Sequence, residues 1–149
     1  MSSVVKQTIS GTITTLLTTG LNSLANNALA VSSAFDNTIA QTGDGYTRAD
    51  IELVVTYGSA PTAGTAVVIW FLRSQDGTNY EDGGTGATPA RAPDLAIEVA
   101  ATTSPQLLIR EADIPPGKFK VLLKNDGTSQ SMAASGNTLK IRPITDGAY

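Results

Sequence analysis

The most constraining feature of the sequence is the apolar run 66–73, Ala-Val-Val-Ile-Trp-Phe-Leu-Arg. Both alternating sets of residues are apolar until Arg73, and the run holds the only Trp of the chain. A strand that is apolar on both faces is typical of the middle of a sheet that is covered on each side. Gly64 precedes the run, and turn residues follow it at 75–79. The run therefore predicts a β-rich core with this strand at its centre.

Alternation of apolar and polar residues predicts further strands on both sides of this run. They are expected over 46–57, 95–100, 106–112, 118–124 and 138–142, joined by connections rich in Gly and Pro. The apolar residues expected to share the buried face are Ile51, Leu53, Val55 and Tyr57; Leu95, Ile97 and Val99; Leu107 and Ile109; Phe119, Val121 and Leu123; and Leu139 and Ile141.

The first 33 residues differ from the rest, because they contain a single charged residue, Lys6, and many Thr. Apolar residues from Ile9 to Ala28 could line one face of a helix, but two Gly and six Thr disfavour that structure. We interpret 8–18 and 28–35 as strands, with the helix as the alternative. Such an uncharged arm is poorly solvated alone, and we expect it to pack on its own body or on a neighbouring chain.

Seven or eight strands without a convincing helix predict two packed antiparallel sheets or a closed barrel. We favour an all-β, antiparallel β-sandwich of the jelly-roll type. A chain of 149 residues fits one domain. The predicted organisation is an extended N-terminal arm over 1–33 and a β-sandwich domain over 34–149.

The composition argues against several classes of function. The chain has no His and no Cys, so it lacks the commonest general base and thiolate metal ligands. Its net charge of −3 does not favour nucleic acid as a partner. No apolar run reaches about 18 residues, and the N-terminus does not read as a secretory signal. We therefore predict no enzymatic activity, no catalytic residue, no cofactor, no metal site, and no nucleic-acid or membrane partner.

Three carboxylates gather in the segment 76–82, Asp-Gly-Thr-Asn-Tyr-Glu-Asp. Oxygen ligands on a tight loop suit Ca²⁺, but the spacing does not match an EF-hand loop. Paired carboxylates could also act in glycoside hydrolysis, but most acidic residues of the chain fall in predicted turns. We interpret the segment as a hairpin turn with solvated acids.

Aromatic residues raise the possibility of a surface that stacks on sugars. Trp70 and Tyr57 lie in apolar strands, which favours a place in the core. Tyr46 and Tyr80 lie in or beside loops and are the better candidates.

Five cations fall on the outward faces of the two last predicted strands. They could contact an acidic partner, or they could protect sheet edges from aggregation. The five cations are Lys118, Lys120, Lys124, Lys140 and Arg142.

Two stretches resemble small virion structural proteins of tailed bacteriophages. One runs over 57–83, from Tyr-Gly-Ser-Ala-Pro-Thr-Ala-Gly-Thr through Trp-Phe-Leu-Arg-Ser-Gln-Asp-Gly-Thr-Asn-Tyr-Glu-Asp-Gly. The other is Pro-Pro-Gly-Lys-Phe-Lys-Val-Leu-Leu-Lys-Asn at 115–125, followed by Ala-Ser-Gly-Asn-Thr-Leu-Lys at 134–140. The resemblance covers roughly residues 46–143 and leaves out the N-terminal arm.

The resemblance implies a capsid decoration (cement) protein, which binds the outside of a phage capsid and stabilises the shell. It implies the major capsid protein as partner, a homo-oligomer with a trimer favoured, and a place on the virion after assembly in the host cytoplasm. The alternatives are a tail or head–tail component and a carbohydrate-binding module for host attachment. The predicted partner interface consists of Ile9, Ile13, Leu16, Leu17, Leu21, Lys118, Lys120, Lys140 and Arg142.

Overall fold

The computed structural model describes residues 6–37, 45–82 and 87–148. These residues form ten strands and one short 3₁₀ turn, Thr19–Leu21. There are more strands than expected because two predicted strands are each divided in two. The strands are β1 (Lys6–Ser10), β2 (Thr14–Leu17), β3 (Leu29–Val31), β4 (Phe35–Asn37), β5 (Arg48–Val55), β6 (Ala66–Arg73), β7 (Leu95–Glu98), β8 (Gln106–Asp113), β9 (Gly117–Asp126) and β10 (Thr138–Ala148).

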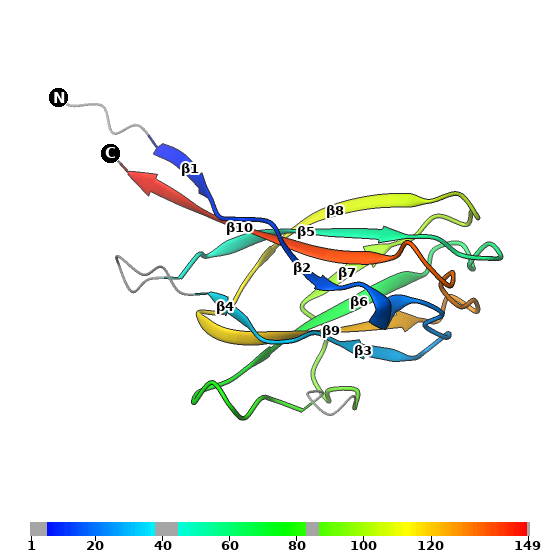
Figure 1. The fold of residues 1–149 in the computed structure, drawn as a ribbon, viewed down its shortest axis with the longest axis horizontal. Helices are drawn as coiled ribbons and strands as arrows, with labels where there is room; N and C mark the ends of the chain where they lie inside the picture. Colours follow the sequence, from blue (N-terminus) through cyan, green and yellow to red (C-terminus); the bar gives the residue numbers. More distant parts are fainter. Residues whose placement is uncertain (1–5, 38–44, 83–86, 149) are drawn as a thin grey trace.

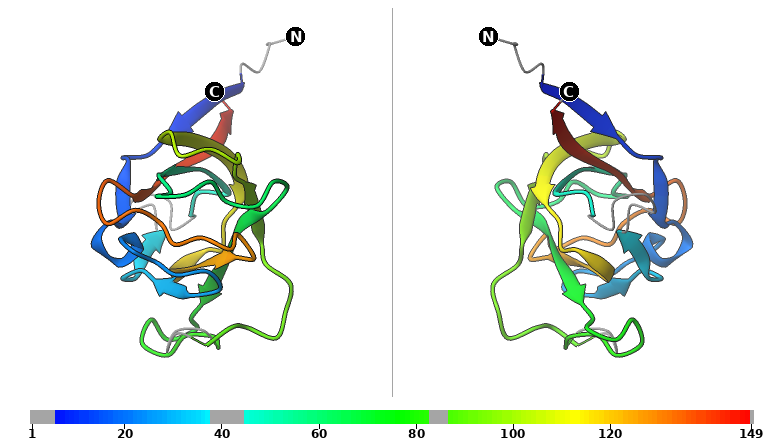
Figure 2. Two further views of the ribbon diagram at one scale, coloured as in Figure 1. Left: turned by 90° about the vertical axis from the view of Figure 1, so that its right-hand side faces the viewer. Right: turned by 90° about the vertical axis from the view of Figure 1, so that its left-hand side faces the viewer.

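Two antiparallel sheets pack face to face, which confirms the predicted all-β sandwich (Figures 1 and 2). The first, here called the β5 sheet, has the order β1-β10-β5-β8, and β2 also pairs with β10. The second, here called the β6 sheet, has the order β3-β9-β6-β7, and β4 also pairs with β9. The last strand is longer than expected, and its end pairs with β1 beyond the body of the sheet (Figure 1).

The core between the sheets is built from the residues that alternation predicted. Ile51, Leu53 and Val55 of β5 are fully buried, as are Leu139 and Ile141 of β10. From the other sheet, Phe119, Val121 and Leu123 face them, also fully buried. Burying side chains of this size stabilises the fold by about 1.5–3 kcal/mol each, so this layer is the main source of stability.

The strand β6 occupies the central place that its sequence predicts, between β9 and β7. One set of its residues, including Ile69 and Phe71, packs in the main core. The other set, Val68, Trp70 and Leu72, is buried on the outer face of the same sheet. Both faces of this strand are therefore covered.

The expected strand over 8–18 is interrupted at Gly11, where the chain leaves one part of β10 and joins another. The Gly11 N–H donates to the Pro143 carbonyl at 2.7 Å. A Cβ at Gly11 would lie 2.6 Å from Pro143 Cγ and 3.1 Å from the Tyr46 ring. No other residue fits this contact without a shift of its neighbours, and the strand is divided into β1 and β2.

The remainder of the N-terminal arm lies in the sandwich. Leu21 is fully buried, Leu16, Leu17 and Leu24 are also buried, and all four belong to the main core. The strand expected over 28–35 breaks at Ser32, whose Oγ accepts the Val121 N–H at 2.9 Å. The helical alternative is wrong for the described part of this arm, which contains strands and the one 3₁₀ turn.

A buried polar cluster joins the two sheets at Asn125. Its Oδ1 accepts from Tyr57 Oη at 3.1 Å and from Thr128 Oγ1 at 2.8 Å. Its Nδ2 donates to the carbonyls of Leu24 and Gln130 at 3.1 and 2.8 Å. Burial raises the pKa of Tyr57 to about 12, although the hydrogen bond with Thr128 acts in the opposite direction. The tyrosine therefore stays neutral wherever the fold is intact near neutral pH.

Candidate interaction surface on the outer face of the β5 sheet

Exposed apolar side chains gather on the outer face of the β5 sheet. Ile13 is 61% exposed and lies just before β2. Leu107 and Ile109 of β8 are 61% and 49% exposed. Within the described residues these three are the exposed large hydrophobic side chains, and all of them lie on this one face. Exposed apolar residues that share a face are typical of an interaction site, whereas scattered ones are not.

The prediction that Leu107 and Ile109 point into the core is wrong. The inward position belongs to Leu108, which is half-buried, packs on the core and pairs with the buried Leu53. The cause is the register, because the run Leu-Leu-Ile at 107–109 offers an apolar residue to either face.

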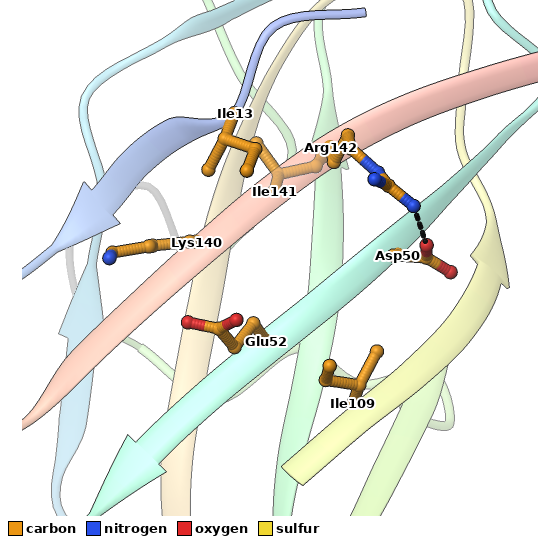
Figure 3. A pocket seen from close by; sticks show the side chains of 7 residues that line it. All are labelled: Ile13, Asp50, Glu52, Ile109, Lys140, Ile141 and Arg142. Atoms are coloured by element: carbon orange, nitrogen blue, oxygen red, sulfur yellow. Dashed lines mark hydrogen bonds and ion pairs between the residues drawn. The ribbon is translucent and has the colours of Figure 1, made fainter. Parts of the chain in front are cut away.

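Charged side chains occupy the middle of this face, between Ile13 on one side and Ile109 on the other (Figure 3). The register places Lys140 opposite Glu52, and Arg142 opposite Asp50. Arg142 Nη2 lies 3.0 Å from Asp50 Oδ2. Opposite charges on directly facing positions stabilise a sheet by a few tenths of a kcal/mol, and exposed pairs contribute at most about 1 kcal/mol. Arg142 and Asp50 therefore satisfy one another, whereas Lys140 and Glu52 face each other across the strands without a direct ion pair.

These side chains line a shallow groove of about 140 Å³. Ligand pockets for small molecules usually measure about 300–1,000 Å³. The groove is too small for that class and fits better as part of a broad contact surface. It is lined by Ile13, Asp50, Glu52, Ile109, Lys140, Ile141 and Arg142.

Sequence reasoning did not select Asp50 and Glu52. Their alternation with Ile51 and Leu53 already placed them on the outward face, which was the available signal. Their cross-strand partners could not be read from it, since those partners are some 90 residues away in the sequence.

The predicted strip of five cations is divided between two opposite faces. Lys140 and Arg142 lie on β10 and point outward from the β5 sheet, whereas Lys118, Lys120 and Lys124 lie on β9 in the β6 sheet. Edge protection is also the wrong explanation, because β9 and β10 each have a neighbouring strand on both sides. One flat partner surface cannot contact both sets.

The other predicted interface residues lie in different surroundings. Ile13 is exposed, as a contact residue needs to be. Leu16, Leu17 and Leu21 are buried in the core and offer no surface to a partner. Ile9 lies in β1, and its side chain is outside the described part of the structure.

The outer face of the β6 sheet is covered by the protein itself. Trp70 is 3% exposed, and its Nε1–H donates to the Arg91 carbonyl at 3.0 Å. The Arg91 guanidinium donates to the Phe71 carbonyl at 2.8 Å and pairs with Glu81 and Asp94 at 3.0 and 2.9 Å. The Asp94 carboxylate accepts the Phe71 N–H at 2.7 Å. These contacts hold the connection between β6 and β7 over the tryptophan.

The acidic segment 76–82 has the contacts of a turn. Asp76 Oδ1 accepts the N–H groups of Asn79 and Thr78 at 2.7 and 2.8 Å. These backbone hydrogen bonds lower the pKa of Asp76 well below its usual range. Among the residues that the structure describes, no three His, Cys, Asp or Glu side chains are grouped as a metal site requires.

The aromatic candidates for sugar stacking are covered to different degrees. Trp70 and Tyr57 are buried, as core packing predicts. Tyr46 and Tyr80 are half-buried, and Lys120 Nζ lies 4.6 Å above the Tyr80 ring. No helix in the described residues is long and apolar enough to span a membrane.

No protein-family model matches the sequence, and no curated protein matches it either. Among solved structures, the chain is similar to "Xyl-CBM35 in complex with glucuronic acid containing disaccharide". The two share 15% sequence identity with a TM-score of 0.40, and the match covers 83% of this chain and 72% of the other. A likeness at this level concerns the fold alone and does not indicate a function.

Proposed function

We propose that this protein is a virion structural protein that binds the outside of a phage capsid and stabilises the shell, with the major capsid protein as its partner. Two features support the proposal. The stretches 57–83, 115–125 and 134–140 resemble small virion proteins of tailed bacteriophages. The outer face of the β5 sheet carries apolar side chains that the protein leaves uncovered.

The observation that carries the proposal is the arrangement of the exposed Ile13 and Ile109 on either side of a band of charged side chains. Burial of exposed apolar area stabilises a complex by about 25 cal/mol per Å². Arg142 and Asp50 already pair with each other, so the partner need not supply a counter-charge for them, and the desolvation cost of covering this pair is offset in part by their mutual attraction. Such a surface suits a broad protein partner.

The shell of a virus offers this kind of partner in many identical copies. A standard interface buries roughly 1,600 Å² in total, and symmetry repeats that stabilisation over the whole shell. A protein with this role needs a rigid body and an apolar contact face. The sandwich and its bare outer face provide both.

The test is co-sedimentation of the purified protein with empty, expanded shells of the phage that encodes it. Replacing Ile13 by Thr keeps a β-branched side chain but removes apolar area, and we expect binding to weaken by about tenfold. Lys118→Gln, on the opposite sheet, is the matched control and should bind as the natural protein does. Equal binding of the two variants would contradict this surface, and no binding to any shell would contradict the function.

Labelled antibody on intact virions distinguishes the alternatives. Signal over the whole head supports a decoration protein, whereas signal restricted to the tail or neck identifies a tail or head–tail component. Binding to a glycan array that is lost in Tyr46→Ala and Tyr80→Ala would instead identify a carbohydrate-binding module.

A further inference from the structure

The strand β8 is an unusually long open edge for this sandwich. It has eight residues and pairs only with β5 in the described part of the chain. The other outer strands are shorter, with five residues in β1, four in β2 and β7, and three in β3 and β4. Natural proteins shorten or interrupt edge strands to prevent pairing with other chains. β8 departs from that rule and also carries Leu107 and Ile109, both exposed.

The register determines which backbone groups of β8 face the open edge. The Ile114 N–H donates to the Thr47 carbonyl at 3.1 Å, directly beyond the Asp113–Arg48 pair. In an antiparallel ladder, hydrogen-bonded positions alternate, so the even-numbered residues of β8 bond to β5. The odd-numbered ones, Leu107 and Ile109 among them, direct their N–H and C=O groups away from the sheet.

A side-chain contact agrees with this assignment. Arg110 Nη1 donates to the Ile109 carbonyl at 2.8 Å, so this acceptor is reached from the open side. The arginine occupies one backbone acceptor that an added strand would otherwise use.

We propose that a second copy of this chain adds to this edge, with β8 antiparallel to β8 of the second copy around a two-fold axis at Leu108. Leu107 then faces Ile109 of the second copy, and Ile109 faces its Leu107. Each of these two pairs exchanges two backbone hydrogen bonds, and the four aliphatic side chains meet on the outer face of one continuous sheet.

The side chains of β8 favour this register among those with the correct backbone polarity. A two-fold axis at Arg110 would place two guanidinium groups directly opposite each other, which destabilises a sheet. An axis at Ile109 would place Leu107 opposite Glu111 of the second copy. The axis at Leu108 is the one that pairs both exposed aliphatic residues, Leu107 and Ile109, with each other, and it also keeps like charges apart.

The pairing is self-complementary, so it closes after two copies. It leads to a dimer, whereas a trimer would need a head-to-tail contact elsewhere. The dimer would place the two outer faces of the β5 sheets side by side. It does not depend on the proposed capsid function, because its test involves no shell.

Sedimentation velocity over a range of concentrations tests the proposal. Ile109→Pro removes an N–H that faces the open edge and leaves the ladder with β5 intact. The two-fold symmetry means that the dimer loses this hydrogen bond at two sites. We expect the dimerisation constant to fall by at least about tenfold. Ile109→Lys, which adds a charge at the edge without restricting the backbone, should act in the same direction. Ile13→Thr, on the same face but away from β8, should dimerise as the natural protein does.

Arg110→Ala should change the dimerisation affinity in the opposite direction, because it frees the Ile109 carbonyl to accept a hydrogen bond from the second copy. We expect it to strengthen dimerisation by several-fold, on the order of one hydrogen bond at each of two sites. A natural protein that stays monomeric at every concentration would overturn the proposal, and so would dimers that Ile109→Pro and Ile109→Lys leave unchanged.

Disulfide trapping tests the register, since the natural chain has no Cys. The proposed pairing places the two copies of position 108 about 4.5 Å apart between Cα atoms, which a disulfide can span. The two copies of position 112 would be separated by about 27 Å along the strands. Leu108→Cys should therefore form a covalent dimer on mild oxidation, and Ala112→Cys should not. Equal cross-linking of the two variants would contradict the register.

Discussion

The two outer faces of this sandwich differ in how far the rest of the chain covers their apolar side chains. On the β6 sheet, Val68, Trp70 and Leu72 are buried beneath a connection that Arg91 and Asp94 hold in place. On the β5 sheet, Ile13, Leu107 and Ile109 stay exposed. One face is thus covered within the chain, and the other keeps exposed apolar side chains.

The difference shows where the local sequence predicts that a strand face will be buried and where it does not. A strand with apolar residues on both faces, such as β6, needs cover on both, and residues of the connection that follows it, Tyr80 and Arg91, contact its outer face. The outer face of the β5 sheet mixes isolated aliphatic residues with facing charges such as Arg142 and Asp50. That mixture is stable in water and still gains free energy when a partner buries it.

Among the substitutions that test this comparison, we expect the largest effect at Trp70. Replacing it with Ala removes the largest side chain of the covered face, and we expect the free energy of unfolding to fall by about 3–5 kcal/mol. Trp70→Phe keeps most of the packing and loses the hydrogen bond to the Arg91 carbonyl, so it should cost less. Urea unfolding followed by circular dichroism measures both. A loss below about 1 kcal/mol in Trp70→Ala would mean that the cover contributes little.

A titration of Tyr57 sharpens the comparison, because this residue belongs to neither outer face and bonds across the two sheets. Its pKa is about 12 in the fold, compared with 10 for an unperturbed tyrosine. The unfolded chain therefore loses its proton first, and stability should decrease as the pH rises from about 10 to 12, by at most about 2–3 kcal/mol.

Chemical unfolding at stepped alkaline pH measures this effect, and Tyr57→Phe is the control. The variant should lose this part of the pH dependence while Asn125 keeps its bond from Thr128. The same slope in both proteins would assign the alkaline loss to other groups.

The smallest effect on stability is expected on the outer face of the β5 sheet. Ile13→Thr combined with Ile109→Thr should change the free energy of unfolding by no more than about 0.5 kcal/mol, because both side chains are exposed. Thermal unfolding is a sufficient measurement. A loss of several kcal/mol would show that these residues support the fold, and the face would then no longer be a candidate for partner contact.

Much of the sandwich could be predicted from local pattern. The alternation of Phe119, Val121 and Leu123 with lysines correctly predicted the buried face of β9. The two-sided apolar run correctly predicted that β6 is buried on both faces. The pattern failed at Leu107 and Ile109, because three consecutive aliphatic residues are compatible with either face. It also missed the interruption at Gly11, which is caused by Pro143, far away in the sequence.

The candidate surface was predicted only in part. Ile13 was selected, and alternation placed Lys140 and Arg142 outward. Whether those cations share a face with Lys118 and Lys120 depends on which sheet receives each strand, and no residue of β9 or β10 encodes that locally.

By itself the sequence determined that this protein would be built from strands around 66–73, since side-chain alternation and apolar content act over a few residues. Only the tertiary structure decided the register of β8, the assignment of strands to sheets, and hence which side chains stay exposed. The physical reason is that each of these choices is set by contacts between strands distant along the chain, and neither strand carries enough information to specify its partner.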